Sequence, residues 1–169
     1  MSVFVFLCPL QEDAPDMAWQ SFQSGTMRLE HPMDWEVTER AGPAGNQILV
    51  AFPEGKGWLM VTLVNDRQKS DADAVSKELV HTLIDKLGMS NKSLQRMDSG
   101  QFYGYPGASY LAQQVIKDRT VEIRAQGRSY KKDLVIITSL DTTEGVHLAT
   151  IQRILRSIHI EKDRLFPTI

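Results

Sequence analysis

The residues best suited to acid–base or metal chemistry are the chain's four histidines, His31, His81, His147 and His159. Their spacing matches none of the HxxxH, HExxH or HxH patterns that place two imidazoles on one metal ion. His31 with Asp34 could act as a base and its orienting carboxylate, but no serine or cysteine lies in a nucleophile motif such as GxSxG. The sequence therefore predicts no catalytic residue, no metal site and no cofactor, and we expect the protein not to be an enzyme.

Five basic residues in the second half of the chain could instead bind a partner: Arg119, Arg124, Arg128, Lys131 and Lys132. Arginine is favoured at the energetic centres of protein interfaces, so this cluster suggests a docking surface for an acidic protein. A solvated hairpin is the alternative, because Lys and Arg are mostly exposed in any case. Nucleic acid is not expected as a partner, because the formal net charge is -2 and aromatic residues are not interleaved as stacking platforms.

Length and composition indicate one ordinary globular domain of 169 residues, with 42% hydrophobic and 24% charged residues. The single cysteine, Cys8, excludes an internal disulfide and a cysteine-cluster metal site. No stretch approaches the ~18 apolar residues of a membrane span. The apolar run from Val3 to Leu7 lacks a preceding Lys or Arg and is shorter than the core of an export signal. As written, the chain is expected to be cytoplasmic, with prior removal of an export signal as the open alternative.

Alternating apolar and polar residues predict short strands in the first half of the chain. Residues 27–31 form the first, Pro32 turns the chain, and a second strand begins near Trp35, which is expected to fill the core at this corner. An antiparallel pair follows over residues 46–65, joined by a glycine-rich loop. Its second member, WLMVTLVN, is apolar at nearly every position and is expected to be buried on both faces.

Apolar residues at helical spacing predict two helices. Ser70 or Asp71 caps the first, Gly88 ends it in the left-handed conformation, and its apolar stripe is Val75, Leu79, Val80, Leu83, Ile84 and Leu87. The second helix begins at about Thr143 and carries Val146, Ile151, Ile154, Leu155 and Ile158.

Between the helices, the pattern predicts a weak strand near residues 92–100 and then a three-stranded meander. Hairpin turns are expected at Asp118-Arg119 and at Gly127-Arg128. The run KKDLVIITSL is the last strand of this meander and has two apolar faces. Gly104 and Gly107, around Pro106, are expected in a turn or bulge rather than in a phosphate loop, because no helix and no lysine–hydroxyl pair follows.

This order of elements favours an antiparallel sheet with helices packed on it, the α+β class. A doubly wound parallel sheet would need more crossover connections than the chain supplies. The expected organisation is an irregular leader over residues 1–24 with Trp19 and Phe22 as candidate anchors, a single domain over residues 25–161 and a polar C-terminal tail over residues 162–169.

The order of five segments along the chain indicates a family. They are the HPMDW corner, the hairpin into GWLMVTLVND, the helix DADAVSKELVHTLIDKLG, the turn and strand YGYPGASYLAQQV, and the closing YKKDLVIITSL…IQRILRSIHI. Over roughly residues 25–160 the chain resembles the PsbP-like superfamily. That superfamily includes the photosystem II extrinsic subunit, the Mog-type Ran-binding proteins and bacterial relatives, some of which are chaperones for secreted effectors. The resemblance implies an antiparallel sheet of about six to seven strands sandwiched by helices, in an α/β/α arrangement. It also implies that the protein acts by binding other proteins.

Three functions remain open on this basis. The first is a non-catalytic protein-binding or assembly module, whose partner and oligomeric state the sequence leaves open. The second is a chaperone-like protein that shields apolar segments of a client, which requires exposed aliphatic side chains on one sheet face; the apolar runs 58–65 and 133–140 permit this. The third and least favoured is an enzyme that acts on a small molecule through His31 or His147.

Overall fold

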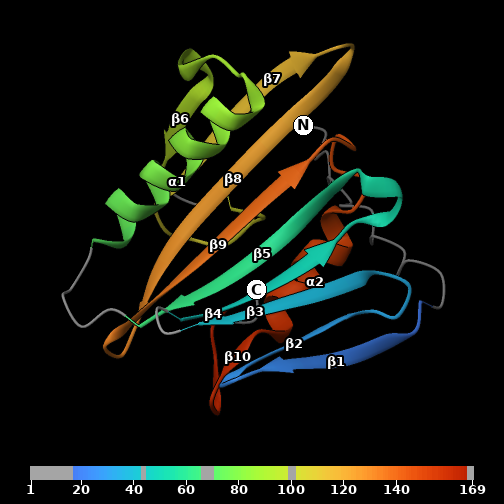
Figure 1. Ribbon diagram of the computed structural model, residues 1–169, viewed down its shortest axis with the longest axis vertical. Helices are drawn as coiled ribbons and strands as arrows, with labels where there is room; N and C mark the ends of the chain where they lie inside the picture. Colours follow the sequence, from blue (N-terminus) through green and yellow to red (C-terminus); the bar gives the residue numbers. More distant parts are fainter. Residues whose placement is uncertain (1–16, 43–44, 66–70, 99–101, 167–169) are drawn as a thin grey trace, which may run out of the picture.

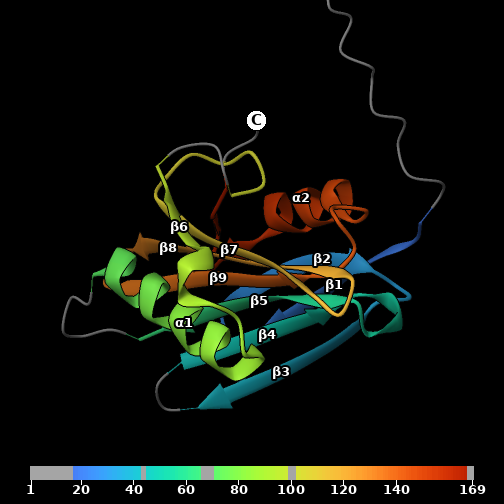
Figure 2. The ribbon, with the colours of Figure 1, turned by 90° about the horizontal axis from the view of Figure 1, so that it is seen from above.

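The computed structural model describes residues 17–42, 45–65, 71–98 and 102–166. Figures 1 and 2 show two helices on opposite faces of a large twisted sheet, with a smaller sheet on the side of the second helix. The expected leader as far as residue 16, with Cys8, lies outside the described residues, and so does the alternative helix cap Ser70.

The large sheet has seven strands in the order β3-β4-β5-β9-β8-β7-β6, and every neighbouring pair is antiparallel. It is flanked by α1 (Ala72–Leu87) and α2 (Leu148–Ser157). The short 3-10 helices η1 (Pro53–Gly55) and η2 (Asn91–Ser93) lie in the connections from β4 to β5 and from α1 to β6. The strand bounds are β3 Glu36–Gly42, β4 Gly45–Ala51, β5 Gly57–Val64, β6 Leu94–Met97, β7 Ser109–Ile116, β8 Arg119–Tyr130 and β9 Asp133–Asp141. The expected α+β class with an antiparallel sheet between helices is confirmed.

A second, four-stranded sheet joins the first described segment of the chain to the last, in the order β1-β2-β10-β11. Its strands are β1 Trp19–Ser24, β2 Met27–Pro32, β10 His159–Ile160 and β11 Asp163–Arg164. Half of it therefore comes from segments that the sequence assigned to an irregular leader or to a polar tail. Phe166, expected in that tail, is fully buried in the core, where its ring packs at a tilt against the Tyr105 ring with the ring centres 4.6 Å apart.

The His-Pro corner passes the chain from the small sheet to the large one. Pro32 ends β2, and its carbonyl oxygen accepts a hydrogen bond of 3.1 Å from the Trp35 amide, which closes a tight turn before β3. Trp35 is 3% exposed and its ring lies 5.1 Å from that of Phe52. The expectation that Trp35 fills the core at this corner is confirmed.

Helix α1 begins and ends where the sequence places it. The Asp71 side chain accepts a hydrogen bond from the Asp73 amide at 3.0 Å, and Gly88 ends the helix with a left-handed φ of 65°. Val80 and Ile84 form its buried stripe and pack on the large sheet. Helix α2 begins at Leu148, later than expected, since residues 143–147 form turns and leave Val146 exposed. Neither described helix is long and apolar enough to cross a membrane.

Two apolar cores lie on opposite faces of the large sheet. The smaller joins α1 to β7 and β8 through residues such as Ile123 and Ala125. The larger joins the other face to α2 and the small sheet, through residues such as Leu59, Val61 and Ile151. Strand β9 is buried on both faces from Leu134 to Ser139, as its doubly apolar sequence predicts.

The predicted turn at Gly127-Arg128 is wrong, because both residues lie inside β8 and the hairpin turn falls at residues 131–132. The neighbouring helix explains the glycine. A Cβ atom at Gly127 would lie 2.5 Å from the Ala72 carbonyl oxygen and 2.6 Å from the Ser76 hydroxyl. Gly127 is therefore required for the close approach of α1 to β8 rather than for a turn. The other predicted turn, at Asp118-Arg119, is displaced by one residue, to Lys117 and Asp118, with φ of 48° and 63°.

Replacement of Gly127 by alanine is expected to lower the free energy of unfolding by about 1–3 kcal/mol, because α1 must move off β8 to admit one methyl group. Urea denaturation measures this change. The matched control is Ser129→Ala in the same strand, where the side chain is exposed, with an expected change within about 0.5 kcal/mol. Equal stability of Gly127→Ala and the native protein would contradict the tight contact.

Candidate functional site

The histidines that could have supported catalysis make structural contacts in four separate places. His31 is buried, and its Nδ1 lies 2.8 Å from the Pro32 carbonyl oxygen rather than against Asp34, which is exposed. The His147 ring packs edge-on against Trp35, with the ring centres 5.1 Å apart. His81 bonds to Asn91 and His159 to the Ser157 carbonyl. Within the described residues, no group of three or more His, Cys, Asp or Glu side chains is placed to hold a metal ion.

The five basic residues predicted as a docking surface do not form one cluster. Strand β8 separates Arg119 at one end from Lys131 and Lys132 beyond the other, over 12 residues, or roughly 40 Å at 3.3 Å per residue. All three are exposed, and Lys131 forms an ion pair with Glu161. A docking role for this set stays a prediction, but the arrangement supports separate contacts rather than one patch.

Arg124 and Arg128, the other two, hold a loop against the sheet. Both side chains lie on the face of β8 that is turned away from α1. The Arg128 guanidinium lies 4.3 Å from the centre of the Phe166 ring, and its Nη2 donates to the Pro106 carbonyl oxygen at 3.0 Å. Arg124 lies 5.0 Å from the centre of the Tyr103 ring. Gly104 and Gly107 in this loop have positive φ of 86° and 119°, which confirms their predicted role in a turn.

A buried polar group lies beneath the same loop. The Tyr103 hydroxyl and the Ser139 hydroxyl are 2.6 Å apart, and the Arg124 Nε donates to Glu122 at 2.6 Å. Burial raises the pKa of the Tyr103 phenol well above its ordinary value of about 10, against the smaller opposing effects of Ser139 and Arg124. The phenol is therefore neutral at physiological pH and serves as a structural hydrogen-bonding group.

The exposed part of the large sheet offers a more extended surface. Leu49 of β4 pairs with Met60 of β5, Met60 with Thr138 of β9, and Thr138 with Ala125 of β8, so these four side chains share one face. Ala125 belongs to the core beneath α1, which identifies this as the α1 side. The helix packs on β7, β8 and the adjoining edge of β9. Figure 1 shows α1 beside β7 and β8 and no described helix over β5, β4 and β3 on this side.

We call this surface the open face; it consists of Glu36, Thr38, Arg40, Gln47, Leu49, Ala51, Trp58, Met60, Thr62 and Val64. Its centre is half-buried and largely apolar, and its outer strand, β3, is exposed and charged. The expectation that residues 58–65 are buried on both faces is therefore wrong for one face. Leu59, Val61 and Leu63 are buried against α2, whereas Trp58, Met60 and Val64 on the α1 side remain partly accessible. The apolar sequence of residues 58–65 predicted the strand correctly, but it did not indicate that no described helix covers the α1 side of that strand.

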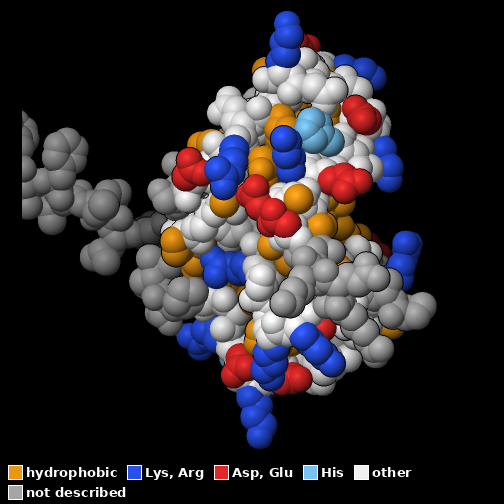
Figure 3. All heavy atoms as spheres, turned by 90° about the vertical axis from the view of Figure 1, so that its left-hand side faces the viewer, with side chains coloured by type: hydrophobic (Ala, Val, Ile, Leu, Met, Phe, Trp, Pro, Cys, Tyr) orange, Lys and Arg blue, Asp and Glu red, His pale blue; other side chains and the backbone are white. Residues whose placement is uncertain are grey.

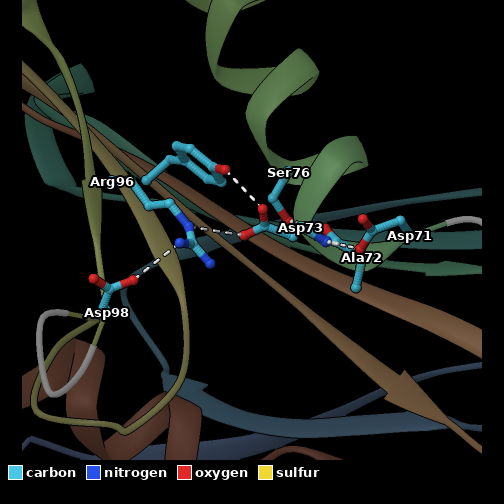
Figure 4. A network of polar contacts seen from close by, with 7 residues as sticks. Asp71, Ala72, Asp73, Ser76, Arg96 and Asp98 are labelled. Atoms are coloured by element: carbon cyan, nitrogen blue, oxygen red, sulfur yellow. Dashed lines mark hydrogen bonds and ion pairs between the residues drawn. The ribbon is translucent and has the colours of Figure 1, made fainter.

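A polar network at the start of α1 fixes the helix away from the open face. The Tyr110 hydroxyl of β7 donates to Asp73 at 2.8 Å, and Arg96 of β6 lies 3.6 Å from Asp73 and 3.2 Å from Asp98 (Figure 4). These contacts tie the first turn of α1, which lies against Gly127 of β8, to the neighbouring strands β7 and β6. The outer side of α1 and β6 mixes acidic, basic and apolar side chains (Figure 3), so that side lacks the single-sign character of an electrostatic docking patch.

Replacement of Arg128 by glutamate is expected to lower the free energy of unfolding by about 2 kcal/mol or more. A carboxylate cannot donate a hydrogen bond to the Pro106 carbonyl oxygen, and it cannot make the cation–π contact with the Phe166 ring. Thermal and urea unfolding measure the loss. Lys132→Glu, in the exposed turn, is the control and should change stability by less than about 0.5 kcal/mol. If both variants unfold like the native protein, Arg128 is a surface residue available for docking.

Replacement of Tyr103 by phenylalanine is expected to alter the alkaline limb of stability. Below about pH 10 the Tyr103 phenol is protonated in both the folded and the unfolded protein. Above that pH it ionises in the unfolded chain but not in the folded protein, because burial raises its folded-state pKa. The free energy of unfolding therefore falls by up to about 1.4 kcal/mol per pH unit on account of this residue. Tyr103→Phe lacks that loss. Its unfolding free energy should be about 1 kcal/mol lower at pH 7 but should fall less steeply above pH 10. Parallel pH curves for the two proteins, measured by urea denaturation, would refute a buried neutral phenol.

Comparison with solved structures agrees with the architecture. The Ran-binding protein Mog1p of Saccharomyces cerevisiae matches with a TM-score of 0.54 and 15% identity, over 89% of this chain and 100% of that one. Cyanobacterial PsbP from Synechocystis matches with a TM-score of 0.50 and 12% identity, over 90% and 99% of the two chains. A point mutant of Mog1 gives a TM-score of 0.52 at 16% identity, over 89% and 100%. No family model and no curated protein sequence matches this chain. The chain therefore has the PsbP/Mog-like fold, as its sequence predicted.

Proposed function

We propose that this chain is a non-catalytic protein-binding module and that the open face receives a segment of its partner. The observation that carries the proposal is the row of half-buried Trp58, Met60 and Leu49 on strands that no described helix covers. Such a row is partly dehydrated already, so an additional apolar segment would complete its burial.

The chemistry of the open face fits a segment of mixed character. Tryptophan and methionine are favoured in interface cores, because each supplies a large contact area and methionine adapts to different shapes. Between them and beside them lie Thr62 and Gln47, whose side chains are joined by a hydrogen bond of 3.1 Å. Glu36 and Arg40 form the charged outer rim. A partner segment with an apolar stripe and flanking polar groups would satisfy both kinds of side chain.

The structural neighbours support the general role without supplying the partner. Mog1p is a Ran-binding protein, and its fold is shared by this chain at 15% identity. At that identity the fold alone is common, so we carry over the expectation of a protein partner and nothing about Ran. The structural contacts of His31 and His147 also favour binding over catalysis.

A chaperone-like role is the second candidate, and the same open face favours it. In that case the occupant is an apolar segment of a client that would otherwise aggregate. The two candidates differ in what is bound, because a docking module selects one folded or amphipathic partner, whereas a chaperone keeps several unfolded apolar segments soluble. A light-scattering assay of client aggregation, with and without the native protein, separates the two.

Replacement of Met60 by glutamate is expected to weaken partner binding by at least about tenfold, because it places a charge at the apolar centre of the open face. The measurement is quantitative affinity capture from the native host with the native protein, Met60→Glu and a control. The control is Lys77→Glu on the exposed side of α1, which should capture the same partner as the native protein.

Circular dichroism and thermal unfolding must show that Met60→Glu is folded before its capture is interpreted. A folded Met60→Glu protein that recovers the partner as well as Lys77→Glu would show that the open face is not the binding surface.

A further inference from the structure

We propose that the edge strand β3 is a dimerisation edge, on which two copies of this chain pair antiparallel about Thr38. The joined sheet then runs through both copies. This inference rests on the geometry and charges of β3 and stands whether or not the open face binds a partner.

Strand β3 is the last strand of the large sheet, and β4 is its only partner among the described strands. In Figure 2 no described element lies beyond it. Glu36, Thr38, Glu39, Arg40 and Ala41 are all exposed. An edge strand of this kind presents a row of backbone N–H and C=O groups that another strand can pair with.

Three of the usual protections against edge pairing, proline, lysine and a β-bulge, are missing from β3, although it carries the charged residues Glu36, Glu39 and Arg40. Its seven residues contain no proline and no lysine, and their register with β4 is continuous from Glu36↔Ala51 to Gly42↔Gly45, without a bulge. The opposite edge of the sheet differs. Strand β6 has only four residues, and its Arg96 is held in ion pairs with Asp73 and Asp98. Within the described part of the chain, the sheet is therefore better protected at the β6 edge than at the β3 edge.

The charges of β3 are complementary to a second copy in one register. A twofold axis perpendicular to the sheet keeps every side chain on its own face, so residues of the same parity meet. With the axis at Thr38, Glu36 faces Arg40 of the second copy and Arg40 faces its Glu36. With the axis at Glu39, Glu39 would face Glu39 of the second copy, which is a repulsive contact. With the axis at Val37, Glu36 and Arg40 do not face each other.

Glu36 and Arg40 have no ion-pair partner among the residues that the structure describes. Pairing at Thr38 therefore supplies a partner for Glu36 and Arg40 without breaking an existing ion pair. Because both residues lie on the α1 side, the new pairs would also join the two open faces into one continuous surface.

The first experiment is a charge swap, read by sedimentation equilibrium of the full chain from about 1 μM to about 500 μM, a range suited to a small interface. We expect the native protein to dimerise reversibly. E36R and R40E each oppose like charges twice and should weaken the dimer by about tenfold or more, whereas E36R/R40E restores opposite charges and should return the dissociation constant to within about threefold. K77E, on α1, should dimerise like the native protein.

The second experiment tests the register. In a C8S background, T38C places two thiols across the axis at a Cβ separation of about 4.5–5.5 Å, close to disulfide reach, whereas V37C and E39C do not meet their own equivalents. We expect T38C alone to give a disulfide-linked dimer under mild oxidation.

A native protein that stays monomeric at the highest concentration would overturn the proposal. So would single charge reversals that dimerise normally, a double swap that remains monomeric while folded by circular dichroism, or faster cross-linking of E39C than of T38C. None of these readouts involves a partner of the open face, so failure here and failure of the proposed function are distinguishable.

Discussion

Strand β9 is the constraint on which the rest of the molecule depends. It is buried from Leu134 to Ser139 and lies between β5, from the first half of the chain, and β8, from the second half. Each fully buried aliphatic side chain contributes roughly 1.5–3 kcal/mol before the opposing conformational entropy is counted. Both faces of β9 must therefore be covered, which places α1 and α2 on opposite sides and fixes the central strand order.

The position of α1 follows from small residues rather than from large ones. Gly127 lets the Ala72 carbonyl and the Ser76 hydroxyl approach the backbone of β8, and the Asp73–Tyr110 hydrogen bond ties the start of the helix to β7. A helix seated there covers β7, β8 and the edge of β9 but leaves β5, β4 and β3 open on that side. The candidate binding surface is thus a consequence of where α1 can come closest to the sheet.

Cationic side chains have a second structural task in this fold. Arg124 and Arg128 lie across the rings of Tyr103 and Phe166, so they close the large core where an irregular loop and the C-terminal segment meet β8. Their role is to satisfy loop carbonyls and cover aromatic faces. The four histidines and the buried phenol likewise make structural contacts.

Sequence alone determined the local elements and the class of fold. The Asp71 cap, the Gly88 terminus, the Val80 and Ile84 stripe and the two apolar faces of β9 follow from periodicity and backbone chemistry, which act over a few residues. Tertiary structure alone decided the rest. A glycine at position 127 could serve a turn or a close contact equally well. Phe166 is buried where Tyr105 and Arg128 meet its ring, and β5 is open on one side because no described element covers it. These properties depend on which distant segments meet, and a local pattern carries no information about that.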